Sequence, residues 1–568
     1  SNTINSSVTV VAQNDAPVLA NAGAGATFTE DGAAVVINSA LTVSDVDNAS
    51  LSGATVTLTN VQANDSLNFV TQNGITGNLV GGVLTLSGSA TVANYETALR
   101  SVTFSNSSQN PNTTARTVAF VVNDGTANSN TINSSVTVVA QNDAPVNSVP
   151  GTQTTAEDTA KVFSSGNGNP ISVSDVDNAS LTVTLTGTNG TITLAGTTGL
   201  TNLTGNGTGT VSFGGTLTDI NNALNGLSFQ PALNFNGAAS LQIVSSDGPA
   251  SDTDSVTVNV TGVNNAPVLN AGATPVLNAV NEDAGAPVNG VAAGTLLSAL
   301  VDLNPPAGGL DNVTDADAGA VTGIAITAAA TTNGTWFYST SATPSWTVLG
   351  TVSEANARLL AADANTRVYF QPNLNFNGTI DPALTFRAWD TTSGANGGTA
   401  NITATGGTTA FSTNSDTAAI TVAAVNDAPV VTAGGTLAYT ENQAATAIDA
   451  SVTVSDVDNA NVVSATVQLT TNYVSGQDVL GFTTQAGITG IFTAGTGTLA
   501  LSGTASTAAY QTALRSVTYV NTSENPSPLS RTVTWSVNDG TTASAAGVTS
   551  TITVAAVNDA PVVTAGGT

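Results

Sequence analysis

The sequence predicts an all-β protein, built as a tandem array of β-sandwich domains that each carry a short helical insertion. Three observations lead to this prediction. A five-residue phrase recurs along the chain, short β-branched runs bounded by glycine turns fill the space between its copies, and one helix-like stretch recurs at a fixed place. Such self-similarity is typical of repeat proteins, and about seven short strands per unit of roughly 100 residues are typical of a sandwich.

The recurring phrase is Asn-Asp-Ala-Pro-Val, and it marks the joints between units. It stands at residues 14–18, 142–146, 426–430 and 558–562, and residues 264–268 read Asn-Asn-Ala-Pro-Val. Proline fixes its own φ, has no N–H to give to a strand ladder and holds the preceding residue extended. We therefore expect stiff joints whose asparagine and aspartate oxygens suit a hard cation.

The joints divide the chain into repeats. Residues 1–18 are identical to residues 129–146, which predicts a partial repeat made of a last strand and a joint. The units that follow are repeat 1 (19–146), repeat 2 (147–268), a longer repeat 3 (269–430), repeat 4 (431–562) and the start of a further repeat (563–568). Because the sequence contains no methionine, we expect an interior segment of a longer chain or a processed product.

The strand-like runs have one recurring exception. Apolar residues spaced by three, four and three positions predict a helix of about three turns that precedes a late strand. This spacing occurs at residues 92–102, 217–227 and 507–517, with a looser version at 352–360. We interpret it as a plug over one end of the sandwich core rather than as a partner-binding helix.

Composition excludes several classes of function. The formal net charge is −29, although only 8% of residues are charged, so nucleic acid and anionic membranes are poor partners and divalent cations are natural ones. Cysteine and histidine are absent, which excludes a disulfide framework, Ser-His-Asp or Cys-His catalysis and histidine-based metal sites. No apolar run of about 20 residues predicts membrane insertion, and no signal peptide is recognisable.

The few arginines recur at matching positions. Arg100 matches Arg515, and Arg116 matches Arg531. In a chain with so few charges, we expect them to anchor carboxylates or backbone carbonyls rather than to recognise a ligand.

Three acidic motifs recur at a fixed phase. The early glutamates are Glu30, Glu157, Glu282 and Glu441. The Asp-x-Asp pairs are Asp45 and Asp47, Asp175 and Asp177, Asp315 and Asp317, and Asp456 and Asp458. The late aspartates are Asp124, Asp247, Asp390 and Asp539. A single Asp-x-Asp can be only a solvated turn, but four copies in phase favour calcium, which takes about six to eight oxygen ligands.

The chain resembles the bacterial cadherin-like repeats over essentially its whole length. The resemblance is carried by the Asn-Asp-Ala-Pro-Val joint, by the Asp-x-Asp pairs and by Phe-Gln-Pro-x-Leu-Asn-Phe-Asn-Gly at residues 229–237 and 370–378. It implies cadherin-like or Ig-like sandwiches with calcium between consecutive domains. The ion would be held by the early glutamate of one domain, by the joint, and by the Asp-x-Asp and late aspartate of the next domain.

Carried over residue by residue, the resemblance implies five sites. The first, incomplete joint would use Asn14, Asp15, Asp45, Asp47 and Asp124. The second would use Glu30, Asn142, Asp143, Asp175, Asp177 and Asp247. The third would use Glu157, Asn264, Asp315, Asp317 and Asp390. The fourth would use Glu282, Asn426, Asp427, Asp456, Asp458 and Asp539, and the last Glu441, Asn558 and Asp559.

Two departures from the family's pattern set the expected ion count. No counterpart of the cadherin Asp-Arg-Glu motif is recognisable, and Asn265 stands where the other joints have aspartate. We therefore expect one or two ions per joint, with the joint after repeat 2 the weakest.

The expected function is non-catalytic. It is that of a calcium-stiffened stalk in a large bacterial surface or secreted adhesin, outside the cell. An enzyme is not expected, because the carboxylates repeat in every unit whereas a catalytic site normally occurs once.

Two alternatives stay open. Residues 1–18 could complete a sandwich of a neighbouring identical chain, which would make a fibre subunit. Repeat 3 could bind glycans, because it holds Trp336, Phe337, Tyr338, Trp346 and Trp389, although alternating aromatics in strands are usually core.

Overall fold

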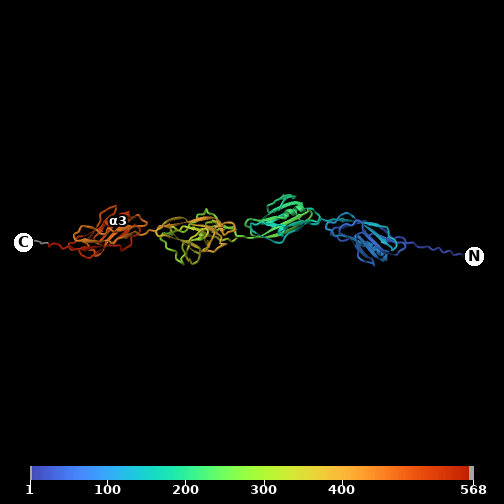
Figure 1. Cartoon of the computed structure of the whole chain (residues 1–568), viewed down its shortest axis with the longest axis horizontal. Coiled ribbons are helices and arrows are strands. Elements are labelled where there is room, and N and C mark those ends of the chain that lie inside the picture. The colour runs from blue at the N-terminus through green and yellow to red at the C-terminus, as the bar shows by residue number, and fades with distance from the viewer. Residues whose placement is uncertain (1–2, 562–568) are drawn as a thin grey trace, which may run out of the picture. The chain divides into compact units, whose positions relative to one another are not determined.

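The computed structural model describes residues 3–561 (Figure 1). The chain divides into two compact units, Ser1–Val263 and Asn264–Thr568, and each is described by itself. Every sheet is built from the strands of one sequence repeat, except that β1, β12, β23 and β35 begin at the valine that ends the preceding joint. The segment 563–568, predicted to begin a further repeat, lies outside the described residues.

Repeat 1 is a sandwich of a six-stranded sheet, β2-β11-β10-β5-β8-β7, and a three-stranded sheet, β3-β9-β6, with β1 paired to β4. Its elements are β1 (Val18–Ala20), β2 (Ala26–Thr29), β3 (Val35–Val36), β4 (Thr42–Ser44), β5 (Ser50–Leu58), β6 (Asp65–Asn68), β7 (Thr76–Val80), β8 (Val83–Thr91), α1 (Val92–Arg100), β9 (Thr103–Asn106), β10 (Arg116–Asn123) and β11 (Ile132–Val139). In β10, Val118, Phe120 and Val122 are buried and alternate with half-buried residues, as the two-residue period of a strand requires. They share one core with Leu67 and Phe104 of the smaller sheet.

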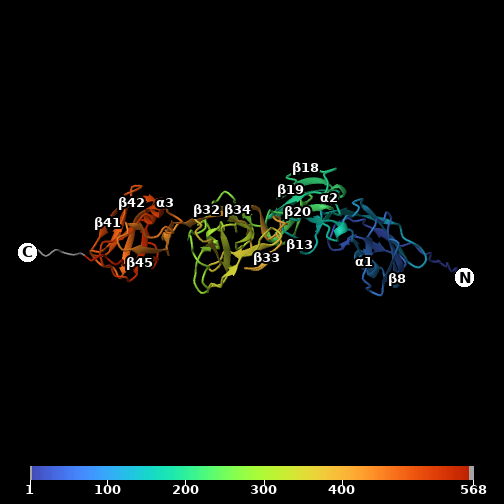
Figure 2. The ribbon, with the colours of Figure 1, turned by 60° about the vertical axis from the view of Figure 1, so that its left-hand side comes forward.

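Repeats 2 and 4 have the same strand order. Repeat 2 comprises β12 (Val146–Ser148), β13 (Gln153–Ala156), β14 (Lys161–Phe163), the 3-10 turn η1 (Ser165–Asn167), β15 (Ser172–Ser174), β16 (Ser180–Thr188), β17 (Gly190–Thr193), β18 (Thr201–Thr204), β19 (Thr210–Thr216), α2 (Leu217–Leu224), β20 (Leu227–Pro231), β21 (Gly237–Ser246) and β22 (Ser251–Thr261). Repeat 4 comprises β35 (Val430–Thr432), β36 (Thr436–Thr440), β37 (Thr446–Ala447), β38 (Thr453–Ser455), β39 (Asn461–Thr471), β40 (Asp478–Gly481), β41 (Thr489–Thr493), β42 (Thr498–Ser506), α3 (Thr507–Arg515), β43 (Thr518–Asn521), β44 (Arg531–Asn538) and β45 (Thr549–Ala555). Figure 2 labels several of these elements.

Repeat 3 pairs a six-stranded sheet, β24-β34-β32-β27-β30-β33, with a four-stranded sheet, β25-β31-β28-β29. Its elements are β23 (Val268–Leu269), β24 (Val280–Asn281), β25 (Thr295–Leu296), the 3-10 turn η2 (Leu297–Ala299), β26 (Val313–Thr314), β27 (Gly323–Ala329), β28 (Gly334–Ser339), β29 (Thr347–Val348), β30 (Ala357–Ala361), β31 (Arg367–Pro372), β32 (Gly378–Trp389), β33 (Thr399–Ala400) and β34 (Phe411–Ala423). It has a second, smaller core around Trp389, Leu359 and Phe411.

Three of the four predicted helices are confirmed. Helices α1, α2 and α3 bury one stripe each against the sandwich, and in α1 this stripe is Tyr95, Ala98 and Leu99. Each begins after a side-chain hydroxyl that accepts a backbone N–H of the first turn, a stabilising N-cap. The caps are Thr91, Thr216 and Ser506.

The prediction of a helix at residues 352–360 in repeat 3 is wrong. This stretch forms a bridge between Ser353 and Asn356 and then β30, which pairs with β27 and β33. Ala357 and Leu359 are buried on either side of half-buried Arg358, so the alternation of a strand applies here. The looser apolar spacing lacked the single stripe that a helix needs. Repeat 3 therefore has no α-helix in its described residues.

The structural role predicted for the arginines is confirmed. Arg100 and Arg515 each donate from Nε to a backbone carbonyl, of Leu41 and Val452, at 2.6 Å. Arg116 and Arg531 form ion pairs inside their sandwiches with Asp65 at 2.9 Å and Asp478 at 3.2 Å.

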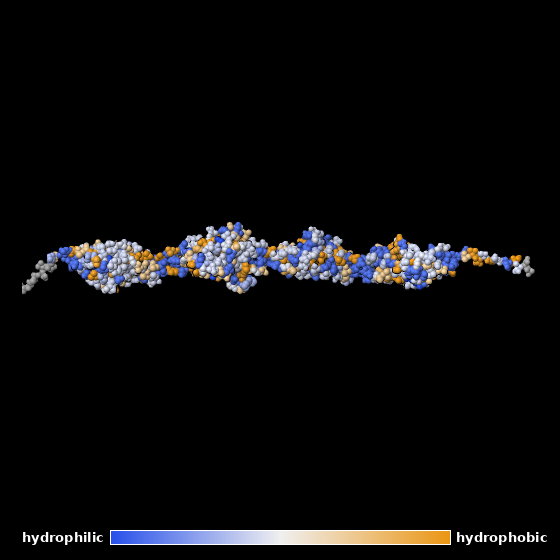
Figure 3. Space-filling model, turned by 90° about the horizontal axis from the view of Figure 1, so that it is seen from below, coloured by the Kyte–Doolittle hydropathy of each residue, from blue (hydrophilic) through white to orange (hydrophobic). Residues whose placement is uncertain are grey.

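The surface agrees with the composition. On the face shown in Figure 3, most residues are pale or blue, and the hydrophobic ones are scattered in small groups. Scattered apolar residues are normal on a soluble protein. Across residues 3–561, no helix is long and apolar enough to cross a membrane.

Candidate metal centres at the joints

Each of the first four joints is tied by the same hydrogen bonds to the repeat that follows it. The joint asparagine donates from its side chain to the late aspartate, at 2.8 Å from Asn14 to Asp124 and 2.8 Å from Asn426 to Asp539. The equivalent bonds join Asn142 to Asp247 and Asn264 to Asp390. The structure therefore brings the predicted joint asparagines and late aspartates together.

The second residue of each joint donates its backbone N–H to the second aspartate of the Asp-x-Asp pair. The donors are Asp15, Asp143, Asn265 and Asp427, and the acceptors are Asp47, Asp177, Asp317 and Asp458. This bond uses the backbone, so Asn265 makes it as its counterparts do. In Asp143 and Asp427, one side-chain oxygen at this position is buried without a donor.

The first aspartate of each Asp-x-Asp pair divides its two oxygens between two tasks. In Asp175, Oδ1 accepts the N–H groups of Asp177 and Asn178 at 2.8 and 2.7 Å and so closes the turn. The other oxygen, Oδ2, is buried and has no hydrogen-bond donor. The same division holds for Asp45, Asp315 and Asp456. All four repeats thus present one bare carboxylate oxygen at the same place.

The early glutamates are buried at the opposite end of their repeats. The backbone N–H of each one bonds the last strand just before the joint, as Glu30 does to Val139 at 2.9 Å. In Glu30 and Glu441, one side-chain oxygen accepts a backbone N–H of the outgoing chain and the other, Oε1, is buried without a donor. Glu282 differs, because Val425 N–H and the Asn377 side chain donate to its two oxygens at 2.7 and 2.8 Å.

Buried carboxylate oxygens without a donor are concentrated at the joints. Within residues 3–561, nine carboxylates have such an oxygen, and eight of them belong to the predicted calcium ligands. The eight are Glu30, Asp45, Asp143, Asp175, Asp315, Asp427, Glu441 and Asp456. None of the four ion pairs in this part of the chain involves any of them. A buried acceptor without a partner costs free energy, so these positions fit an external cation.

The electrostatics of the second joint show that two repeats contribute to one cluster. Burial raises the pKa of Glu30, the hydrogen bond from Gln141 opposes the change, and the charges of Asp143 and Asp177 raise the pKa further. Burial also raises the pKa of Asp143, and the charges of Asp177, Asp31 and Asp175 act in the same direction. The charges of Asp143 and Asp177 thus reach Glu30 across the second joint, and the predicted calcium site of Glu30, Asp143, Asp175 and Asp177 stays a prediction.

The fourth joint has the same character. Burial raises the pKa of Asp427, and the charges of Asp283, Asp458, Glu282 and Asp456 add to it. The late aspartate behaves in the opposite way. Burial raises the pKa of Asp539, but the N–H groups of Thr542 and Thr541 and the Asn426 amide outweigh it and lower the pKa. Asp539 thus stays ionised beside a group of carboxylates that repel one another.

Two other joints are described in part. The third joint falls between the two compact units, so its grouping of Glu157 with Asn264, Asp315, Asp317 and Asp390 stays a prediction. Within repeat 3, burial raises the pKa of Asp315, the N–H of Asp317 opposes the change, and the Asp317 and Asp390 charges raise it again. At the final joint, Asn558 donates to the Asp559 carbonyl at 3.2 Å. Carboxylate oxygens of Glu441, Glu524 and Asp559 lie within 4.8 Å of one another there.

Sequence reasoning missed several residues of these sites. Asn178 donates to Asn142 at 3.0 Å, and Asn48 and Asn459 do the same at their own joints. These asparagines directly follow Asp-x-Asp, which was a usable signal. Asn377 in the Phe-Gln-Pro-x-Leu-Asn-Phe-Asn-Gly motif positions Glu282, and Asn236 donates to Glu157 at 3.3 Å.

A further missed feature is that repeats 1 and 4 place an additional carboxylate at two different positions. In repeat 1, Gln109 donates to Asp31, which follows the early glutamate, at 2.7 Å. In repeat 4, Glu524 stands at the position of Gln109, and Asn442 stands at the position of Asp31. The extra carboxylate is therefore kept at the joint but comes from a different loop. Only an alignment of the two repeats over this loop could have revealed it.

The donor set fits calcium. It consists of carboxylate, amide and backbone oxygens, without histidine or cysteine, and such ligands suit hard cations. Within residues 3–561, the carboxylates whose oxygens all lie within 4.8 Å of one another are Glu441, Glu524 and Asp559; at the other joints, oxygens without a donor belong to an early glutamate, a joint aspartate and the first aspartate of Asp-x-Asp. At the second joint these would be supplied by Glu30, Asp143 and Asp175. The ion would supply positive charge that no ion pair supplies there in the described part of the chain.

The aromatic residues of repeat 3 are largely structural. Trp336 and Trp389 are 2% and 1% exposed and pack in the cores. Arg358 lies over the Tyr338 ring at 4.8 Å, and half-buried Trp346 packs edge-on against Tyr369. The aromatic surface on which the glycan prediction rests is thus mostly unavailable for stacking on a sugar.

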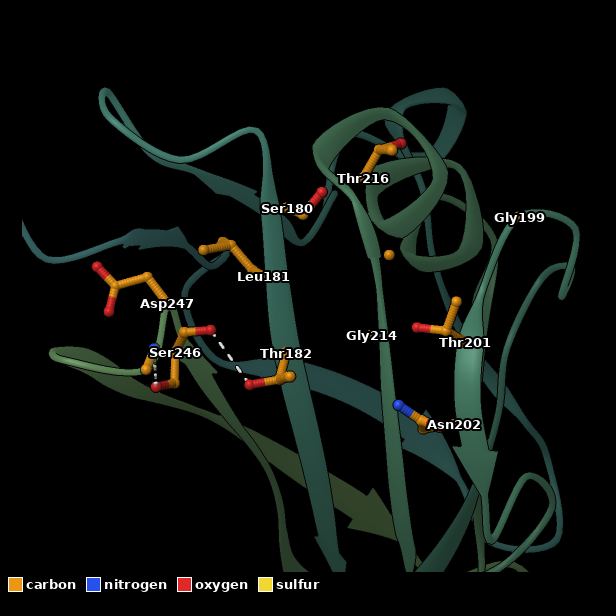
Figure 4. Close-up of a pocket in the computed structure, with 12 residues that line it drawn as sticks. Ser180, Leu181, Thr182, Gly199, Thr201, Asn202, Gly214, Thr216, Ser246 and Asp247 are labelled. Atoms are coloured by element: carbon orange, nitrogen blue, oxygen red, sulfur yellow. Dashed lines mark hydrogen bonds between the residues drawn. The ribbon is translucent and has the colours of Figure 1, made fainter.

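A shallow groove in repeat 2 is lined by small and hydroxyl-bearing residues (Figure 4). Thr182, Thr201, Asn202 and Gly214 lie along the sheet face, and Asp247 reaches the rim. In Figure 4 the Asp247 carboxylate points away from Thr201 and Asn202. The late aspartate therefore faces the joint rather than this groove, in agreement with its bond to Asn142.

Comparison with known proteins gives only distant structural likeness. No protein family and no curated protein matches the chain by sequence. Among solved structures, zebrafish RET cadherin-like domains 1 to 4 match 88% of this chain and 96% of theirs, with 10% identity and a TM-score of 0.18. The titin fragment I67-I69 matches 73% of this chain and 99% of its own, with 9% identity and a TM-score of 0.20. The endo-fucoidan hydrolase MfFcnA4 covers 65% of this chain and 39% of its own, with 16% identity and a TM-score of 0.14. Scores this low carry no argument, so the assignment of tandem β-sandwich repeats rests on the strands and cores described above.

Proposed function

We propose that this chain is a non-catalytic, calcium-stiffened stalk segment of an extracellular adhesive protein of bacterial type. The observation that carries the proposal is the recurrence of bare, buried carboxylate oxygens at the ends of the repeats. The interior of each repeat is closed by its own core, so what an ion can change is the connection between repeats. An ion held by residues from two repeats and their joint favours one relative orientation of the two repeats over the many others.

The expected energy is modest for each ion and adds along the chain. Extracellular calcium modules bind at about 10⁻⁴–10⁻³ M. At about ten times the dissociation constant, each ion stabilises its joint by about 1.4 kcal/mol. That is a change of about tenfold in the ratio of straight to bent joints. Such a ratio suits a stalk that works in a calcium-rich medium outside the cell.

Small-angle scattering and limited proteolysis of the whole chain, with calcium and with a chelator, test this function. We expect calcium to lengthen the particle, and chelation to shorten it and to open cleavage sites at residues 142–146 and 426–430. A matched control is the variant in which Glu30, Asp143 and Asp175 are changed to Gln, Asn and Asn. This variant should be cleaved at the second joint even in calcium while the fourth joint stays protected. Identical scattering and cleavage in both conditions would refute the proposal.

A second candidate is a fibre subunit, and one observation favours it. Val8 and Val10 are 87% and 88% exposed, whereas Val136 and Val138 in the identical segment of β11 are buried. In the described part of residues 1–17 the chain lies outside any strand. A segment able to form a strand is thus available to another sandwich. Electron micrographs separate the candidates, because ordered filaments support the fibre and beaded single particles support the stalk.

Glycan binding by repeat 3 stays a prediction without an observation in its favour. Screening the whole chain on a glycan array tests it, and the variant Trp346→Ala identifies repeat 3 as the source of any signal. A blank array removes the prediction.

A further inference from the structure

Strand β41 forms a free edge of the six-stranded sheet in repeat 4. The strand order ends with β42 and then β41, so β41 has a hydrogen-bonded neighbour on one side only. Figure 2 labels β41 beside β42. In an edge strand, every second residue directs its backbone N–H and C=O outward, where they can pair with another strand.

The side chains of β41 suit pairing with another strand. Thr489, Ile491 and Thr493 are exposed on one face, and Ile491 is 71% exposed. Gly490 and Phe492 face the sandwich, and Phe492 packs against the core. Two of the three exposed residues are threonines and the third is isoleucine, types that favour strands.

This edge lacks the features that keep edge strands apart. The register of β41 with β42 is regular over five residues, without a bulge. No proline and no charged residue occurs between Asp478 and Arg515. Proteins commonly protect such edges with lysine, proline, bulges or very short strands.

Four other edge strands of the six-stranded sheets differ from β41 in register, length or sequence. In repeat 2, the register of β18 is irregular between Thr201 and Thr204. In repeat 3, the edge strand β33 has two residues. In repeat 1, β7 matches β41 in length but has Asn78 at the position of Ile491. The opposite edge of the repeat 4 sheet, β36, runs directly into Glu441.

We propose that β41 pairs with β41 of a second copy of this chain, antiparallel and across a two-fold axis. Centred on Ile491, this register places Ile491 opposite its own equivalent and Thr489 opposite Thr493. Directly opposite side chains in antiparallel strands contact one another, and apolar β-branched pairs are favourable. The two sheets then continue as one.

Charge does not oppose a second copy as the occupant at this edge. The chain has a formal net charge of −29, so two copies repel over most of their surface. The uncharged segment between Asp478 and Arg515 is a place where copies approach with little local repulsion. The association does not depend on calcium at the joints, because no candidate ligand lies on β41.

Single-cysteine variants of the whole chain test the register directly, because the natural sequence has no cysteine. Opposite Cα atoms in antiparallel strands lie about 4.5 or 5.5 Å apart, within the range of a disulfide. We expect Ile491→Cys to form a disulfide dimer at least about tenfold faster than the matched control Asn78→Cys on β7. Equal rates for the two variants would overturn the proposal.

Sedimentation velocity over a concentration series gives the second readout. The wild-type chain should show a monomer–dimer equilibrium, Ile491→Lys should weaken it at least about tenfold, and Asn78→Lys should leave it unchanged. Ile491→Asn, which places the residue of β7 in β41, serves as a variant expected to fold normally and should also weaken the dimer. A wild-type chain that stays monomeric throughout, or a dimer equally strong in all variants, would contradict the proposal.

Discussion

The interior of a repeat and its ends hold buried carboxylates in opposite ways. Inside repeats 1 and 4, Asp65 and Asp478 each meet an arginine, and both partners of each pair have fully buried side chains. At the ends, Glu30, Asp143 and Asp175 each keep a buried oxygen without a donor, and none of them has an ion pair in the described part of the chain.

The difference shows where the chain supplies its own cation and where it does not. A buried charge is costly unless it is paired and hydrogen-bonded. The chain has eight basic residues, and it places two of them beside the interior aspartates. The chain has too few arginines to pair with all the carboxylates at the ends of the repeats. In the proposed function, an ion from solution supplies the positive charge there.

Removing an interior arginine should have the largest effect. Arg531→Ala leaves Asp478 buried without its cation, and we expect a loss of about 3–5 kcal/mol in the free energy of unfolding of repeat 4. Denaturant unfolding should show the same loss with calcium and with a chelator. Arg515→Ala, which removes a bond to the Val452 carbonyl, is the matched control and should cost less. A loss that appears only in calcium would break the comparison.

Neutralising a carboxylate at an end should have a smaller effect that depends on calcium. Asp175→Asn keeps an oxygen for the turn but removes the charge. In calcium at about ten times the dissociation constant, it should cost up to about 1.4 kcal/mol through loss of the ion. In a chelator it should be neutral or stabilising, because a like charge is removed from the cluster. Thermal unfolding measures both conditions.

Asp65→Asn is the interior control for this test. It should destabilise repeat 1 to the same extent in both conditions, since Arg116 is its partner. If Asp175→Asn and Asp65→Asn respond to calcium alike, the distinction between ends and interior is lost.

One substitution should strengthen an interior pair. In repeat 4, the Tyr519 hydroxyl donates to Asp478 at 2.5 Å, and repeat 1 has the buried Phe104 at the matching position. Phe104→Tyr should give Asp65 the same donor and raise the free energy of unfolding by about 0.5–1.5 kcal/mol. Chemical unfolding of the whole chain checks this value. A clear destabilisation would mean that the site in repeat 1 cannot accept the hydroxyl.

The smallest expected effect is the pH dependence of stability, which should differ in sign between carboxylates at the ends and in the interior of a repeat. Without calcium, burial and neighbouring charges hold the pKa of Asp143 and Asp427 above its usual range, so the folded joint binds protons more tightly than the unfolded chain does. The joints should therefore become more stable as the pH falls from 7 through this raised pKa toward the ordinary range of aspartate.

Asp449 in repeat 4 should show the opposite sign. Burial raises its pKa, but hydrogen bonds from Ser451, Ser550 and two backbone N–H groups outweigh it and lower the pKa strongly. Its contribution is complete above about pH 4, the ordinary range of aspartate, and is lost as the pH falls below that. Proteolysis at the joints and unfolding of repeat 4, followed from pH 7 to 3 in a chelator, should move in opposite directions. Parallel changes would contradict the assignment.

The local patterns were sufficient for most of the fold. The two-residue alternation and the three-four-three apolar spacing predicted the strands and α1, α2 and α3, because each pattern depends on burial of one face alone. The stretch at residues 352–360 failed because its apolar residues also satisfy a strand, and pairing with β27 and β33 decided between the two.

The candidate sites were predictable where a motif recurs and not where contacts between loops decide. The Asp-x-Asp pairs and joint residues stood out by repetition. Which loops meet at the end of a sandwich decides whether the additional carboxylate is Asp31, as in repeat 1, or Glu524, as in repeat 4. It also decides that Asn377 lies beside Glu282. No periodic signal encodes such contacts.

The most direct test of calcium at the ends is an anomalous-difference map of the second joint, from crystals grown with calcium. The account predicts a peak about 2.3–2.6 Å from oxygens of Glu30, Asp143 and Asp175. Density for water alone at that position, with these side chains turned toward solvent, would contradict it.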